Sequence, residues 1–230
     1  SACFPNTAMT AGTSTPINFI NGGQSMTFSI NPGAGSSTPS NGGSVNVTTY
    51  DAINVFGSGS IGVAAQSIGG GGGLILGNSA NIASAALPAM GTYLGTGGSV
   101  AVNVGNAINL APSATGSIGV LAQSIGGGGG FIGDPNMPLS ASLPSFSGTN
   151  ITSANSTAGG TVGVAVLPGA AIKLYGANQT GIVAQSVGGG GGFASVNGNV
   201  VTQNTALTQG SQSGSGGSVQ VDVYGSIIDI

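Results

Sequence analysis

The sequence has very little charge. Of its 230 residues, one is Lys or Arg, four are Asp or Glu, and none is His. A single basic residue cannot neutralise a phosphate backbone or hold a protein to an anionic lipid surface. Neither nucleic acid nor a charged membrane is therefore expected as a partner.

The same scarcity limits catalysis and metal binding. Without His, a serine triad lacks its usual base, and the four Asp do not share one position of a repeat that could form a carboxylate pair. Cys3 is the only cysteine, which excludes an intrachain disulfide and a thiolate cluster. The glycine runs also lack the Asp of calcium-binding nonapeptide repeats. We expect no enzyme, no cofactor and no metal.

Long apolar runs are missing as well. Gly, Ser, Asn and Gln interrupt the apolar segments every few residues, so none approaches the roughly 20 residues that a membrane-spanning helix needs. Hydrophobic residues nevertheless make up 40% of the chain, which is too many for a disordered segment. The sequence predicts a folded chain with no transmembrane helix.

One glycine-rich unit is present in three and a half copies. The string IGVAAQSIGGGGGL begins at Ile61, and close variants begin at Ile118 and Gly181. Before each string, and once more near Ser218, a Gly-Gly pair opens a valine-rich segment. Such repetition is the sequence signature of a stacked repeat architecture. The expected units are residues 43–97, 98–159 and 160–216, with a partial unit at 217–230, behind an N-terminal segment or cap at 1–40.

Each unit is expected to contain three short strands. In the first, valines alternate with small or polar residues, as in a strand with one buried face. The buried positions of the first strand are Val45/Val47, Val100/Val102, Val162/Val164 and Val219/Val221. Those of the second strand are Ile53/Val55, Ile108/Leu110, Ile172/Leu174 and Ile228/Ile230, and the third strand carries Val63, Val120 or Ile182.

These features predict an all-β parallel solenoid of glycine-rich repeats, each about 60 residues long. No segment has a helical period, and glycine weakens helices. A repeat of this length is expected to supply two coils rather than one, given strands about 4.8 Å apart. The variable stretches 74–97, 131–159 and 193–216 would form the second coils or protruding loops.

Three runs of five glycines are the most distinctive feature. They extend from Gly69 to Gly73, from Gly126 to Gly130 and from Gly188 to Gly192. A phosphate-binding loop would need a following helix and a Lys or acidic partner, which are missing. A structural role is favoured, because glycine lets backbones turn sharply or approach one another closely. The equal length of the runs indicates that a register is kept.

A glutamine recurs just before each glycine run. Gln66, Gln123 and Gln185 are 57 and 62 residues apart. A catalytic or ligand-binding role is conceivable, but identical amides on successive coils can bond to one another as a ladder. We therefore predict a glutamine ladder.

Two further alignments carry predictions. Asn54, Asn109, Lys173 and Asp229 align at an outward position of the second strand, so Lys173 and Asp229 are candidates for an ion pair between repeats. Leu74, Phe131 and Phe193 follow the glycine runs. An aromatic residue there could stack on a sugar, but a position that also accepts Leu favours packing.

The AQS[IV]GGGGG string followed by a Gly-Gly-Ser-Val strand resembles the repeats in the passenger regions of large autotransporter-like surface proteins of Gram-negative bacteria. The resemblance covers the chain from Asn41 onward. It implies a right-handed parallel β-helix that is exported to the cell surface or released, which agrees with the handedness preferred by parallel crossovers. The sequence departs from the family in showing no outer-membrane barrel after the repeats, and residues 1–40 lie outside the resemblance.

The sequence therefore favours a non-enzymatic extracellular structural protein. If the protein is secreted, we expect this sequence to be the mature chain, without a signal peptide. Low charge and unguarded β-edges favour head-to-tail self-association into a fibre. The alternative is an adhesin passenger that binds glycans or other surfaces through the variable stretches. A third hypothesis is binding to ice or another flat surface, although the scattered Thr form no regular array.

Overall fold

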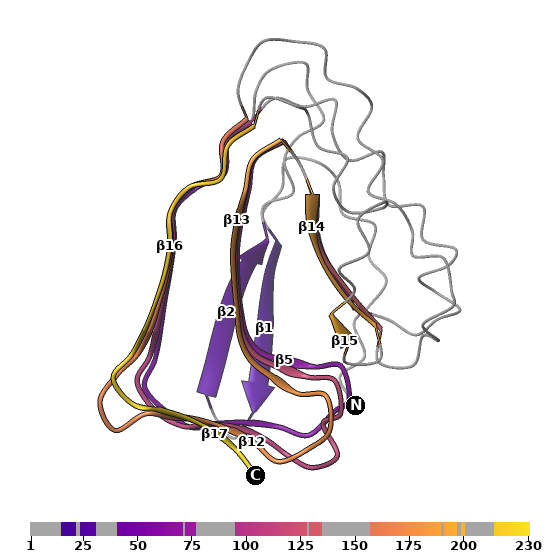
Figure 1. Cartoon of the computed structure of the whole chain (residues 1–230), viewed down its shortest axis with the longest axis vertical. Coiled ribbons are helices and arrows are strands. Elements are labelled where there is room, and N and C mark those ends of the chain that lie inside the picture. Colours follow the sequence, from indigo (N-terminus) through magenta and orange to yellow (C-terminus); the bar gives the residue numbers. More distant parts are fainter. Residues whose placement is uncertain are drawn as a thin grey trace.

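The computed structural model describes residues 15–21, 24–30, 41–70, 72–76, 95–127, 129–134, 157–189, 191–196, 199–200 and 214–230. Within these residues the chain is all-β and contains no helix. The predicted all-β class is confirmed, and the parallel strands stack into sheets in a way compatible with a β-solenoid (Figure 1).

Four parallel sheets run along the stack. The first has the order β16-β11-β7-β3 and contains β3 (Val45–Thr49), β7 (Val100–Val104), β11 (Val162–Val166) and β16 (Val219–Val223). The second contains β4 (Ile53–Val55), β8 (Ile108–Leu110), β12 (Ala171–Leu174) and β17 (Ser226–Asp229). The third contains β5 (Ile61–Ile68), β9 (Ile118–Ile125) and β13 (Thr180–Val187).

The fourth sheet is formed after the glycine runs. It contains β6 (Gly72–Leu76), β10 (Gly129–Asp134) and β14 (Gly191–Val196), and β15 (Asn199–Val200) pairs antiparallel with β14. Near the N-terminus, β1 (Thr15–Asn21) and β2 (Gln24–Ile30) form an antiparallel pair. The predicted cap at residues 1–40 remains a prediction.

Strands from successive repeats are direct neighbours in every sheet. Val45 pairs with Val100, Val100 with Val162, and Val162 with Val219. We call β3–β6 coil 1, β7–β10 coil 2, β11–β14 coil 3, and β16 with β17 coil 4. No strand intervenes between equivalent positions, so the prediction of two coils per repeat is wrong. Four sides and their turns take up much of each repeat, and most of the variable stretches lie outside the described residues.

The core lies between the first three sheets. The predicted inward residues of the first sheet are buried in the middle coils, with Val102 and Val164 at most 2% exposed. They pack against Ile108 and Ile172 from the second sheet and Val120 from the third. The period-two pattern thus predicted which face of these strands is buried.

The second strand of the last unit lies in a different register from the predicted one. Lys173 pairs with Ile228, and Asp229 pairs with Leu174. The predicted alignment of Lys173 with Asp229 is therefore wrong by one residue, and so is the inward assignment of Ile228 and Ile230. The cause is the turn before the strand, because residues 167–170 form this turn in coil 3 but only residues 224–225 form it in coil 4.

Candidate functional site

The glutamines of the three AQS strings form a ladder along the third sheet. Gln66 Nε2 donates to Gln123 Oε1 over 2.7 Å, and Gln123 Nε2 donates to Gln185 Oε1 over 2.8 Å. The last amide, Gln185 Nε2, donates to the carbonyl of Gly192 over 3.3 Å. Gln123 is fully buried, so its amide is supplied with partners by the ladder rather than by water.

The serine after each glutamine joins two coils. Ser67 Oγ donates to the carbonyl of Gly43 in its own coil and accepts from the N–H of Gly98 in the next coil. Ser124 makes the same bonds with Gly98 and Gly160, and Ser186 makes them with Gly160 and Gly217. All six oxygen–nitrogen and oxygen–oxygen distances are 2.7 or 2.8 Å. We call each serine with its glycine partners a serine staple.

The Gly-Gly pairs leave the space that the staples need. A Cβ on Gly97 or Gly159 would clash with the Oγ of Ser124 or Ser186, respectively. A Cβ on Gly160 would clash with the carbonyl of Gly98 in the preceding coil. A side chain at Gly97 or Gly159 would displace the serine of its own coil, and a side chain at Gly160 would push two coils apart. The staples were not predicted from the sequence, although the Ser and the Gly-Gly pair recur in every complete unit.

The five-glycine runs turn the chain from the third sheet into the fourth. Gly70, Gly127 and Gly189 have φ angles of 82°, 83° and 80°, in the left-handed region that favours glycine. A Cβ on the preceding residue, Gly126 for example, would meet the backbone of Ala158. The later glycines enter β6, β10 and β14 in register, where Gly130 lies against the carbonyl of Gly73.

Phe131, which follows the second glycine run, packs inside the protein. Phe131 pairs with Leu74 and Phe193 in the fourth sheet. Phe131 is 2% exposed, and it forms a small cluster with Ile118 and Leu121, against which Leu74 packs. At this position the structure favours packing over a sugar-stacking role for Phe131.

Other polar side chains tie the turns of neighbouring coils. Gln179 accepts from the N–H groups of Tyr175 and Gly176, and its Nε2 donates to the carbonyls of Ala111 and Ala114 in the preceding coil. On the second sheet, Asn109 Nδ2 donates to Asn54 Oδ1 over 2.9 Å. The predicted alignment of Asn54 with Asn109 is confirmed, and the two side chains are joined by this hydrogen bond.

The register shift separates Lys173 from Asp229. Side chains of register partners lie on the same side of a parallel sheet, so Asp229 shares the side of Leu174 and Lys173 shares the side of Ile228. Asp229 thus continues the inward column of Val55, Leu110 and Leu174. The predicted ion pair does not form, because the two side chains lie on opposite sides of the sheet.

Metal-ligating side chains do not gather in the part of the chain that the structure describes. Within it, no three side chains of the His, Cys, Asp or Glu type lie where they could hold one metal ion. The same residues contain no helix with the length and hydropathy needed to cross a membrane. Cys3 lies outside the described residues.

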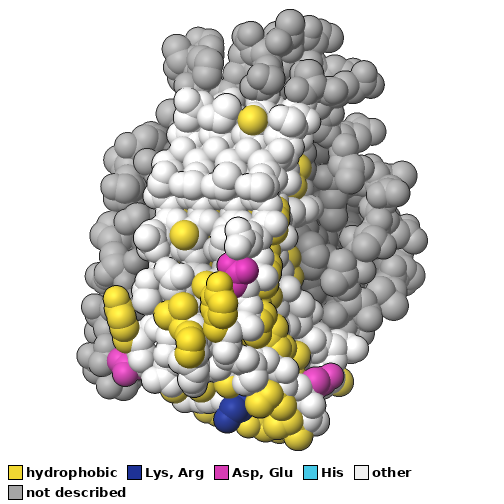
Figure 2. Space-filling model, turned by 60° about the vertical axis from the view of Figure 1, so that its left-hand side comes forward, with side chains coloured by type: hydrophobic (Ala, Val, Ile, Leu, Met, Phe, Trp, Pro, Cys, Tyr) yellow, Lys and Arg dark blue, Asp and Glu magenta, His cyan; other side chains and the backbone are white. Residues whose placement is uncertain are grey.

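A shallow depression of about 180 Å³ lies on the outer face of the first sheet. Asn103, Gln220 and Asp222 supply its polar side chains. Figure 2 shows this side of the molecule, where uncharged polar groups and backbone dominate and few charged side chains occur.

No protein-family model, no curated protein and no solved structure matches the chain.

Proposed function

We propose that the chain is a non-enzymatic structural segment, a right-handed β-solenoid that serves as an extracellular scaffold at the bacterial surface. The observation that carries the proposal is the use of the repeated polar side chains. The glutamines and serines that recur in each unit form hydrogen bonds with neighbouring coils. Residues conserved between repeats for catalysis would instead present donors and acceptors toward a substrate.

Location and handedness in this proposal rest on the sequence. The AQS[IV]GGGGG units resemble autotransporter-like passenger repeats, which are exported. Parallel crossovers are right-handed in nearly all known sheets. A surface of uncharged polar groups, with one basic residue in the whole chain, also suits a protein that works in an assembly.

The scaffold is proposed to extend by head-to-tail association of copies. In coil 4, Val219, Val221 and Val223 are 44–45% exposed, whereas Val162, Val164 and Val166 at the same positions of coil 3 are nearly fully buried. A band of apolar side chains lies along this edge of the stack in Figure 2. A further coil with the same valine pattern, from a second copy or from a longer chain, would bury these side chains as coil 4 buries those of coil 3.

The first sheet gives the association a direction. Every strand in it pairs parallel with its neighbour, from β3 through β7 and β11 to β16. Copies stacked head to tail continue this parallel pairing, because β3 of the next copy then runs in the same direction as β16. The glutamine ladder does not cross the junction, since the third sheet has no described strand in coil 4 and Gln185 Nε2 donates to Gly192. Parallel pairing therefore favours a polar fibre.

Asp229 restrains this association. In a head-to-tail stack, its carboxylate would lie in an apolar column next to the Val55 of the next copy, and burying an unpaired charge is costly. An inward-pointing charge is one of the devices by which natural proteins protect sheet edges. We therefore expect association to depend on concentration rather than to be irreversible.

Sedimentation velocity over a range of concentrations tests the proposal. Val221→Lys places a charge on the inward side of β16 and is expected to weaken association at least about tenfold, since it adds a buried charge. Gln220→Lys is the matched control, because it adds the same charge to the outward side of the same strand. Equal association of the two variants and the unmodified chain would contradict the proposed interface.

A further inference from the structure

The outer face of the first sheet forms a shallow trough. Side chains alternate between the two faces of a strand, so the residues between the inward valines point outward. The middle strands β7 and β11 present Ala101, Gly163 and Ala165 there, which have at most a methyl group, and the amide of Asn103. The flanking strands present only polar and aromatic side chains, namely Asn46, Thr48 and Tyr50 from the β3 side and Gln220, Asp222 and Tyr224 from the β16 side.

The lowest part of this trough is the depression of about 180 Å³. Gly163 lies on its floor, and a Cβ placed there would meet no atom within 4 Å. Ala101 and Ala165 complete a flat floor of small apolar groups. The volume is below the roughly 300–1,000 Å³ of pockets that enclose a drug-sized molecule. It suits one ring of a longer ligand that lies along the surface.

Hydrogen-bonding groups flank the floor on both sides. Gln220 Nε2 donates to Asp222 Oδ2 over 2.8 Å, which fixes the amide and the carboxylate beside one another. Asn103 lies on the other side, two strands away, which is about 10 Å at ordinary strand spacing. Amide and carboxylate groups of this kind accept from, or donate to, the hydroxyl groups of a ligand.

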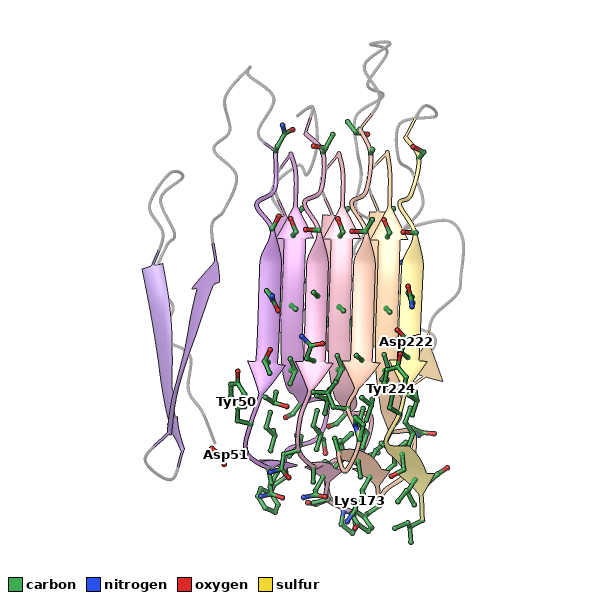
Figure 3. All side chains as sticks on the ribbon, turned by 90° about the vertical axis from the view of Figure 1, so that its left-hand side faces the viewer. Tyr50, Asp51, Lys173, Asp222 and Tyr224 are labelled. Atoms are coloured by element: carbon green, nitrogen blue, oxygen red, sulfur yellow. The ribbon has the colours of Figure 1, made fainter. Side chains whose placement is uncertain are left out.

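Two exposed tyrosines stand at one end of the trough. Tyr50 is 80% exposed and Tyr224 is 66% exposed. Figure 3 shows them near the same end of the strands, one on the first coil and one on the last coil, with Asp222 close to Tyr224. An exposed aromatic ring offers a flat apolar face and a hydroxyl group, a combination enriched in binding sites.

The charge of the region excludes an anionic ligand. The chain has a single basic residue, Lys173, and it belongs to the second sheet. The charged groups nearest the trough are Asp222 on its rim and Asp51 beside Tyr50. A phosphate, sulfate or uronate group would meet only negative charge and neutral amides here.

We propose that this trough binds a neutral oligosaccharide. A sugar ring has apolar C–H faces, which fit the Gly163 and Ala165 floor and the tyrosine rings, and a rim of hydroxyl groups, which fit Asn103, Gln220 and Asp222. The ligand lies along the outer face with one ring in the depression and a neighbouring ring against Tyr224. This activity is separate from coil stacking, which uses the edge of the sheet rather than its outer face.

Isothermal titration calorimetry of the full chain with cellohexaose, chitohexaose and maltohexaose tests the proposal. Binding of at least one of them is expected, and Gly163→Gln is expected to abolish it by filling the floor. Tyr224→Ala is expected to weaken it about fivefold, in line with the worth of an aromatic contact. Gly43→Gln and Phe56→Ala are the matched controls, since Gly43 also has no atom within 4 Å of an added Cβ and Phe56 is exposed at another corner.

Binding that is lost in Gly163→Gln and kept in both controls would support the trough as the site. Failure of all three oligosaccharides to bind at about 10 mM, the weak end of useful affinities, would overturn the proposal. Binding that Gly163→Gln leaves unchanged would also overturn it, because the sugar would then bind elsewhere. Tighter binding of polygalacturonate than of any neutral probe would contradict the proposed ligand class.

Discussion

Ser124 Oγ accepts a hydrogen bond of 2.7 Å from the N–H of Gly160, which belongs to the next coil. The same hydroxyl donates to Gly98 in its own coil, so one fully buried atom connects two neighbouring coils. With equivalent bonds at Ser67 and Ser186, these staples tie each described coil to the next.

Ser124→Ala is expected to destabilise the protein by about 1–3 kcal/mol, because it leaves the partly buried carbonyl of Gly98 and N–H of Gly160 without the serine hydroxyl. Thermal unfolding followed by circular dichroism measures the effect. Ser113→Ala is the control, since Ser113 makes an exposed bond to the carbonyl of Phe56 and should cost less than about 0.5 kcal/mol. Equal effects of the two substitutions would contradict the staple.

Gln123→Leu is expected to cost about 1–3 kcal/mol, because the amides of Gln66 and Gln185 lose the partner between them. Replacing all three glutamines by Leu should cost less than three times as much, since no ladder amide is then left without its partner. Denaturant unfolding of the single and triple variants measures the difference. Strictly additive costs would show that the ladder bonds are not coupled.

Gly126→Ala is expected to destabilise the protein by about 1–3 kcal/mol or more, because the new Cβ would press on the backbone of Ala158. Gly163→Ala adds the same methyl group where it meets nothing, and it should be neutral or slightly stabilising. Comparing the two melting temperatures separates close packing from a general cost of losing glycine. Similar melting temperatures would contradict the close approach at Gly126.

The sequence predicted the parts of the fold that depend on local periodicity. The inward faces of Val102 and Val164 follow from strict alternation, and the glutamine ladder follows from one residue type kept at one place in each unit. Both patterns lie within a single strand of each unit. They can therefore be recognised even where the segments between the strands differ in length.

Features that depend on turn length or on distant contacts could not be predicted in the same way. Aligning Asp229 with Lys173 required the turn length of coil 4, which is shorter than that of coil 3. Copies 1 and 2 have the shorter spacing, from Thr49 to Ile53 and from Val104 to Ile108, and they were the better guide. The staple between Ser124 and Gly160 joins residues that are 36 positions apart. The sequence around either residue does not indicate that it contacts the other.

Asp229→Leu is expected to strengthen self-association about tenfold or more. The substitution extends the apolar column of Val55, Leu110 and Leu174 to the edge of the stack and removes a charge that association would bury. Sedimentation velocity at matched concentrations measures the shift. Asp222→Leu is the control, because Asp222 lies outward on β16. An equal gain in both variants would point to net charge rather than to the inward column.

Cryo-electron microscopy of the purified protein at high concentration tests the central claim most directly. We expect polar filaments built by head-to-tail stacking, with an axial repeat that is a multiple of the strand spacing of about 4.8 Å. Val221→Lys should lack filaments, and Gln220→Lys should retain them. Dispersed single particles at every concentration, in the unmodified chain and in Asp229→Leu alike, would contradict a self-associating scaffold.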